Sequence, residues 1–171
     1  MHQGLPHSCP REHWRDSAAD QVVVLLARPS TVDISTDELL SVLSADEQHR
    51  VARLRRTEDR RRSALGSALS RSLLGQWLDL PPTAVPLTRT REGKPILTPA
   101  AASSGPWFNV SHSGDVVLVA FSRFGRVGVD VEEPQPLDDL LSVATTAFVA
   151  SEVEQVRAAT GEEQLACFYR L

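Results

Sequence analysis

Three short β-rich runs follow one another in residues 107–132, WFNVSHSGDVVLVAFSRFGRVGVDVE. The runs are residues 107–111, 116–121 and 126–132, and the turn-forming sequences S-G-D and R-F-G separate them. This spacing is typical of consecutive antiparallel hairpins. We therefore predict three adjacent antiparallel strands in this part of the chain.

Helical patterns lie on both sides of these runs. Before them, the apolar residues 21–27 predict a first buried strand, and a capping box at residues 44–47 predicts the start of a helix. A second helix begins near residues 57–59, and its apolar residues recur every three or four positions as far as Trp77. Further helices are expected at residues 138–146, 151–159 and 162–171. Helices and hairpins in separate blocks predict an α+β fold.

The composition is that of an ordinary globular protein. The chain has 171 residues, of which 42% are hydrophobic and 23% charged, and its net charge is −4. These values argue against a disordered, collagen-like or coiled-coil protein. No apolar run approaches the roughly 18 residues of a membrane span. Cys9 and Cys167 are far apart and lack zinc-site spacing, so we expect a cytoplasmic protein that does not enter a membrane.

Residues 1–20 contain no hydrophobic stretch that would predict a signal peptide, and we expect them to form a loose leader. His2, His7 and His13 are possible metal ligands, but this segment carries no sign of a rigid element. We therefore expect no metal site there.

Two acidic residues stand out in the third β-rich run. Because strand side chains alternate, the valines of residues 127–132 should share the buried face, and Asp130 and Glu132 the other face. Two positions along a strand span about 7 Å, which lets both carboxylates bind one cation. Oxygen ligands suit Mg²⁺, which completes its shell with water and phosphate. Taken alone, however, this pattern more often marks two solvated acids.

His112 ends the first run, between Ser111 and Ser113. A turn at this point can offer backbone N–H groups, two hydroxyls and an imidazole to an anion. A hydrolase is a competing interpretation, but adjacent strand residues point to opposite faces, which makes Ser111 and His112 a poor nucleophile and base. A capped hairpin with an exposed histidine is the structural alternative.

A basic cluster precedes the strands. Residues 46–71 hold eight arginines and four acids, a local charge of +4 that leaves −8 on the rest of the chain. Such a patch indicates a phosphate ligand or an acidic partner. A nucleic acid is an alternative, although the cluster lacks interleaved aromatic residues and the net charge opposes a polyanion. The arginines could also form a solvated helix surface paired with Glu58 and Asp59.

The order of these features resembles the surfactin-type 4′-phosphopantetheinyl transferases. The matching motifs are the basic helix within residues 43–66, G-K-P at 93–95, F-N-V-S-H-S-G at 108–114 and G-V-D-V-E at 128–132. The only lysine, Lys94, falls in the second motif. The resemblance covers about residues 43–171. It implies an α+β fold of two similar halves with coenzyme A between them, so that residues 21–125 form the first half and 126–171 begin the second.

The resemblance also implies a reaction and its residues. Such enzymes transfer the 4′-phosphopantetheine group of coenzyme A to a serine of an acyl or peptidyl carrier protein, with Mg²⁺, often in secondary metabolism. By motif position, Asp130 and Glu132 would hold Mg²⁺. Six polar or basic residues are assigned to coenzyme A: Lys94, Ser111 and His112 at the phosphates, and Arg50, Arg62 and Ser63 near the adenosine 3′-phosphate. Neither a membrane nor a nucleic acid is expected as a partner.

The sequence departs from the family pattern at two places. Glu47 stands where many relatives carry a basic residue, which weakens the expected 3′-phosphate clamp. The family motif W-x-x-K-E-x-x-x-K follows an aromatic run like residues 168–171, and its glutamate is the third metal ligand and the general base. We therefore expect that base beyond Leu171 and little activity from residues 1–171 alone. A non-catalytic domain that binds coenzyme A or a carrier protein is the alternative function.

Overall fold

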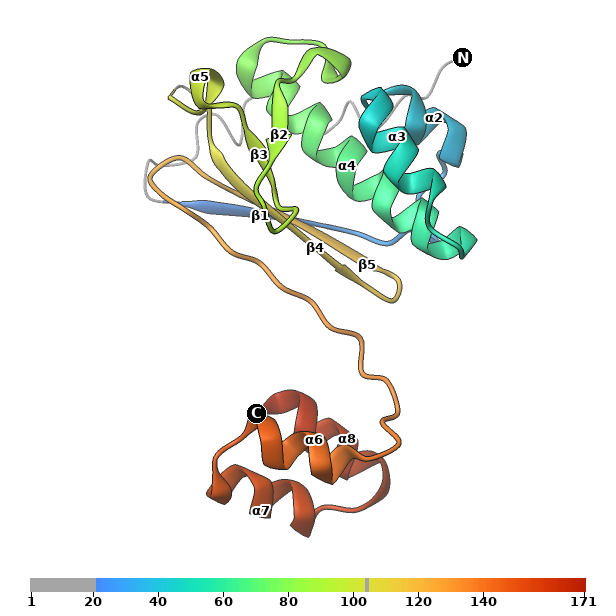
Figure 1. Cartoon of the computed structure of the whole chain (residues 1–171), viewed down its shortest axis with the longest axis vertical. Coiled ribbons are helices and arrows are strands. Elements are labelled where there is room, and N and C mark those ends of the chain that lie inside the picture. Colours follow the sequence, from blue (N-terminus) through green and yellow to red (C-terminus); the bar gives the residue numbers. More distant parts are fainter. Residues whose placement is uncertain (1–20, 104) are drawn as a thin grey trace. The chain divides into compact units, whose positions relative to one another are not determined.

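The computed structural model of the chain describes residues 21–103 and 105–171 (Figure 1). It divides into two compact units, the first ending at Glu132 and the second comprising Glu133–Leu171. Helices occur together with antiparallel strands in the described residues, which confirms the predicted α+β class.

The main sheet of the first unit is three-stranded and antiparallel, with the order β1-β5-β4. Its strands are β1 (Val22–Ala27), β4 (Trp107–Ser113) and β5 (Val116–Ser122). In the β4–β5 hairpin Phe108 pairs with Phe121, and the turn has Gly114 at a φ of 51°. The first of the two predicted hairpins is therefore confirmed.

Helix α4 (Thr57–Leu78) covers one face of this sheet (Figure 1). Its buried side, which includes Ala64, Leu65 and Leu74, belongs to the same core as the inward-facing residues of β5. At Gly66 an added Cβ would lie 3.2 Å from a methyl group of Val110 on β4. The glycine therefore allows the helix to approach the sheet closely.

The other elements of the first unit are short: α2 (Thr36–Ser41), α3 (Ala45–Ala52), the 3₁₀ helix η1 (Pro82–Ala84), β2 (Leu87–Arg89), β3 (Pro95–Leu97) and α5 (Pro99–Ala102). The predicted capping box of α3 is confirmed, because Glu47 N–H donates to Ser44 Oγ and Ser44 N–H donates to the Glu47 carboxylate. Residues 83–106 contain the β2–β3 hairpin.

The first strand was expected to be buried, and this prediction is wrong for one of its faces. Val22, Val24 and Leu26 are 45%, 52% and 60% exposed. β1 is an edge strand of the sheet, and α4 packs only against the opposite face. The apolar run therefore predicted the position of the strand correctly, but it did not show whether other elements cover one face of the strand or both.

The predicted second hairpin, formed by residues 116–121 and 126–132, is also wrong. β5 pairs with β1 instead, and residues 126–132 are extended without forming a regular strand. The segment runs beside β4 in the same direction, and the N–H groups of Val129 and Val131 donate to the side chains of Asn109 and Ser111. Side-chain oxygens thus replace the backbone carbonyls of a β ladder.

The second unit consists of α6 (Leu140–Ala147), α7 (Ala150–Ala158) and α8 (Gly161–Arg170), which confirms the three helices expected there. Phe148 and Phe168 pack with ring centroids 5.2 Å apart. Cys167 is a free thiol, whereas Cys9 and the histidines at 2, 7 and 13 lie outside the described residues. In the described part of the chain, no helix combines the length and apolar character needed to cross a membrane.

Candidate functional site

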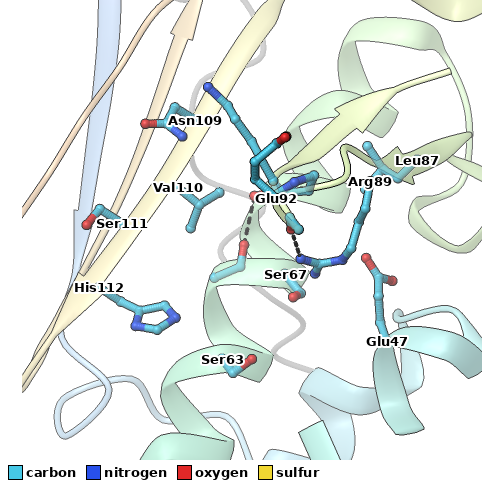
Figure 2. Close-up of a pocket in the computed structure, with 15 residues that line it drawn as sticks. Glu47, Ser63, Ser67, Leu87, Arg89, Glu92, Asn109, Val110, Ser111 and His112 are labelled. Atoms are coloured by element: carbon cyan, nitrogen blue, oxygen red, sulfur yellow. Dashed lines mark hydrogen bonds between the residues drawn. The ribbon is translucent and has the colours of Figure 1, made fainter. Parts of the chain in front are cut away.

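A cavity of about 490 Å³ lies between α4, the β2–β3 turn and β4 (Figure 2). Four of the residues assigned to coenzyme A line it: Ser63, Lys94, Ser111 and His112. They come from three elements that are distant in sequence. The fold therefore brings these four residues to one cavity.

Ser111 and His112 point to opposite faces of β4, as strand alternation predicts. His112 extends toward Ser63 of α4 (Figure 2). The Ser111 hydroxyl instead donates to Asp130 Oδ1 at 2.6 Å and accepts the Val131 N–H at 3.2 Å. Because this hydroxyl is already engaged away from His112, the pair is unsuited to act as nucleophile and base.

The two carboxylates lie together on the exposed side of residues 126–132. Asp130 and Glu132 are exposed, whereas the three valines between residues 127 and 131 are half-buried, so the predicted alternation is confirmed. A serine of β4 binds each acid, because Ser111 donates to Asp130 and Ser113 Oγ donates to Glu132 Oε1 at 3.1 Å. The hydrogen bond from Ser111, followed by that from the Val131 N–H, lowers the pKa of Asp130 below its ordinary value.

Asp130 and Glu132 are suited to bind Mg²⁺ and would form part of its coordination shell. Two solvent-exposed carboxyl groups supply the oxygen ligands that Mg²⁺ prefers, and the ion usually keeps several waters and binds substrate phosphates. Within residues 21–103 and 105–171, no group of three His, Cys, Asp or Glu side chains forms a complete metal site. Asp130 and Glu132 would supply only part of the oxygen shell of the ion.

Lys94 reaches the cavity from the tight turn between β2 and β3. Gly93 has a φ of 87°, in the region that favours glycine. The turn closes through two backbone hydrogen bonds, from Thr90 N–H to Lys94 O at 2.9 Å and from Gly93 N–H to Thr90 O at 3.0 Å. The glycine of the G-K-P motif therefore shapes the turn that carries the lysine.

Arg50 lines a neighbouring cavity of about 280 Å³, which shares Glu47 and Arg89 with the first. Burial and then repulsion from Arg50 lower the pKa of Arg89, and the opposing effect of Glu47 is smaller. Two guanidinium groups that repel each other beside a cavity favour an anion there. Arg89 was not assigned to the site from the sequence. The only indication of such a role in the sequence is that a basic residue lies in the strand that precedes the G-K-P motif.

Arg62 lines neither of these two cavities. Its guanidinium donates to the Gly114 carbonyl and pairs with Asp59. Arg62 therefore attaches α4 to the β4–β5 turn. Its partner Asp59 is one of the two acids that were expected to pair with the arginines of the helix surface.

Glu47 lines both cavities, but its charge is already paired. Its carboxylate, in a side chain only 6% exposed, accepts hydrogen bonds from Arg71 Nε and Ser44 N–H. The acid that interrupts the expected 3′-phosphate clamp is thus neutralised by a buried arginine.

We expect Ser111→Ala to raise the pKa of Asp130 toward its ordinary value, because the largest stabilising hydrogen bond to the carboxylate is lost. In the parent chain, the stability contributed by this bond is present above the unfolded pKa and is lost as the pH falls through the lowered folded pKa. An NMR titration of side-chain carboxyl carbons measures the shift. Ser113→Ala, which removes the bond to Glu132, is the control and should leave Asp130 unchanged. An Asp130 titration that does not move in Ser111→Ala contradicts the expectation.

Comparisons with known proteins agree on one family. The model of the family described as "4'-phosphopantetheinyl transferase, N-terminal" matches residues 28–123. The 4'-phosphopantetheinyl transferase HetI of Nostoc sp. is 37% identical over 78% of this chain and 56% of the relative. A putative 4'-phosphopantetheinyl transferase of Synechocystis sp. is 35% identical over 77% and 53%, and ffp of Bacillus subtilis is 30% identical over 86% and 63%. The chain thus spans somewhat more than half the length of these curated relatives.

Proposed function

Because this chain belongs to the 4′-phosphopantetheinyl transferase family, we propose that it binds coenzyme A for transfer of the 4′-phosphopantetheine group to a serine of a carrier protein. The observation that carries the proposal is the meeting of Lys94, Ser63 and His112 at one cavity. Ser111, a further lining residue of that cavity, links it to the carboxylate of Asp130.

The proposed roles follow from the chemistry of phosphoryl transfer. This reaction needs little covalent work from the protein and depends on positioning and on cations that stabilise charge on the phosphates. Lys94 supplies a positive charge, and His112 and Ser63 supply hydrogen-bond donors from β4 and α4. Asp130 and Glu132 would hold Mg²⁺, which when bound neutralises charge on the pyrophosphate.

A second phosphate group of coenzyme A would bind in the neighbouring cavity. We assign the adenosine 3′-phosphate to Arg50 and to Arg89, which lines both cavities. Arg71 pairs with Glu47, so that acid does not oppose the phosphate with an uncompensated charge. Arg62 lines neither cavity and is assigned an indirect role, because it positions α4 against the β4–β5 turn.

The proposed partners are coenzyme A and an acyl or peptidyl carrier protein, with 3′,5′-ADP and the modified carrier as products. The attacking group is the serine hydroxyl of the carrier. Its oxygen forms the new bond to the β-phosphorus of coenzyme A as the bond to 3′,5′-ADP breaks. Such a reaction belongs in the cytoplasm, where its substrates are made.

We expect the full chain to bind coenzyme A in the presence of Mg²⁺, and His112→Ala and Lys94→Ala each to weaken binding by about tenfold or more, since each removes a charge-assisted or polar contact to phosphate. Isothermal titration calorimetry with coenzyme A measures both effects. Glu154→Ala, on an exposed helix of the second unit, is the control and should bind as the parent does. A parent chain that does not bind coenzyme A contradicts the proposal.

Transfer itself is measured by incubating the chain with coenzyme A, Mg²⁺ and an apo carrier protein and then weighing the carrier. A mass gain of one phosphopantetheine group supports transfer by this chain. Binding of coenzyme A without a mass gain instead favours the alternative of a non-catalytic binding domain.

A further inference from the structure

The turn between α3 and α4 and the first turn of α4 expose four arginines that we call the arginine corner: Arg53, Arg55, Arg56 and Arg60. Arg60 Nε donates to the Leu54 carbonyl at 2.7 Å, which closes the turn. None of the four forms an ion pair with a carboxylate of the described residues. The corner is therefore a positive surface in which four exposed arginines outnumber Glu58, the exposed acid among them.

Most acids near this surface are paired or buried, and Glu58 is the exposed acid beside the four arginines. Asp59 pairs with Arg62, and Glu47 is buried against Arg71. The net charge of the whole chain is nevertheless −4, so the positive charge is local rather than general. A local field of this kind attracts an anionic partner and orients it as it approaches.

The corner lies at the end of the first unit that carries the two exposed carboxylates. Arg62, two residues after Arg60, attaches the start of α4 to Gly114 in the β4–β5 turn. Figure 1 shows the start of α4 beside that turn. Ser113, the residue before Gly114, in turn binds Glu132. Ser63, the residue after Arg62 on α4, lines the proposed coenzyme A cavity.

We propose that the arginine corner is the docking surface for an acidic face of the carrier protein, so that the carrier serine approaches beside Asp130 and Glu132. This inference rests on the proposed function, because it names where the second substrate binds. Guanidinium groups suit the purpose, since their planar donors pair with carboxylates in a bidentate manner.

A protein partner fits the corner better than a nucleic acid. The residues between the four arginines are Leu54, Thr57, Glu58 and Asp59. None of them is an aromatic side chain on which bases could stack. The acidic remainder of the chain also repels a long polyanion, whereas a small acidic protein contacts only the corner.

The test is binding of a fluorescently labelled apo acyl carrier protein to the full chain, followed by anisotropy at about 50 mM salt without coenzyme A. We expect Arg55→Glu with Arg56→Glu to weaken binding by about tenfold or more, because two attractive charges become repulsive. Arg55→Lys with Arg56→Lys keeps both charges and should retain most of the affinity. Arg157→Glu with Arg170→Glu makes the same charge change in the second unit and should stay within about twofold of the parent, because these residues are not part of the proposed contact.

Titration of the same variants with coenzyme A separates this inference from the proposed function. Weaker carrier binding with unchanged coenzyme A binding supports the docking surface. If the Arg55→Glu, Arg56→Glu variant binds the carrier as tightly as the parent does, the docking surface is overturned. It is also overturned if the Arg157→Glu, Arg170→Glu variant loses as much carrier affinity as the Arg55→Glu, Arg56→Glu variant. A parent chain that binds coenzyme A but not the carrier also overturns the docking surface alone, and a parent that binds neither overturns both. Loss of binding to a labelled DNA oligonucleotide, with the carrier unaffected, would assign the corner to nucleic acid instead.

Discussion

Replacing Arg71 by alanine should lower the free energy of unfolding of the first unit by about 3–5 kcal/mol, the usual cost of leaving a buried charge without its partner. Arg71 is 3% exposed, and its Nε donates to the Glu47 carboxylate. Its Nη1 donates to the carbonyls of Pro82 at 2.8 Å and Val85 at 3.2 Å. One side chain thus connects α4 to the start of α3 and to the turn that leads into β2.

Chemical denaturation followed by circular dichroism measures this effect. Glu47→Leu combined with Arg71→Met removes both charges and should cost less than Arg71→Ala alone, since no unpaired charge is left buried. Arg157→Ala breaks the exposed pair with Glu154 in the second unit and serves as the control, with little expected change. If Arg71→Ala is as stable as the parent chain, the buried pair does not hold these elements together.

The second large effect is expected at the two carboxylates, and it rests on the proposed function. Asp130→Asn combined with Glu132→Gln keeps the size of both side chains but removes both negative charges. We expect Mg²⁺ to strengthen coenzyme A binding to the parent chain and to have no effect on this variant, because neutral amides are poor ligands for the ion. Any phosphopantetheine transfer should fall by about a hundredfold or more, given the charge stabilisation that a metal supplies.

Calorimetric titration with coenzyme A, with and without Mg²⁺, measures the change. Asp138→Asn, which removes an exposed acid of the second unit, is the matched control and should keep the full Mg²⁺ effect. A double variant that retains this effect would show that the ion is bound by other residues.

Features set by neighbouring residues were predictable from the sequence. The capping box at Ser44 and Glu47 depends on a spacing of three residues, and the β4–β5 hairpin on apolar runs joined by a turn. The exposure of Asp130 and Glu132 follows from alternation in an extended chain, even though their segment is not a regular strand. Each of these predictions needs only local backbone geometry.

Features that depend on distant partners were not predictable in this way. The extended segment bearing Asp130 is held by hydrogen bonds from its backbone to the side chains of Asn109 and Ser111. An alternating residue pattern does not distinguish a segment held in this way from a strand held by backbone hydrogen bonds. The role of Arg89 depends on its approach to Arg50, which lies on a different element. The exposed face of β1 depends on which side of the sheet α4 covers.

The family resemblance, the α+β class and the types of side chain available for binding phosphate and metal follow from the residues alone. That Lys94, Ser63 and His112 meet at one cavity, whereas Arg62 attaches a helix to a turn, depends on how the elements pack. The pairing of Glu47 with Arg71 depends on the same packing. The physical reason is that motifs and periodicity record short-range constraints, whereas the partner of a charged side chain is set by packing between elements far apart along the chain.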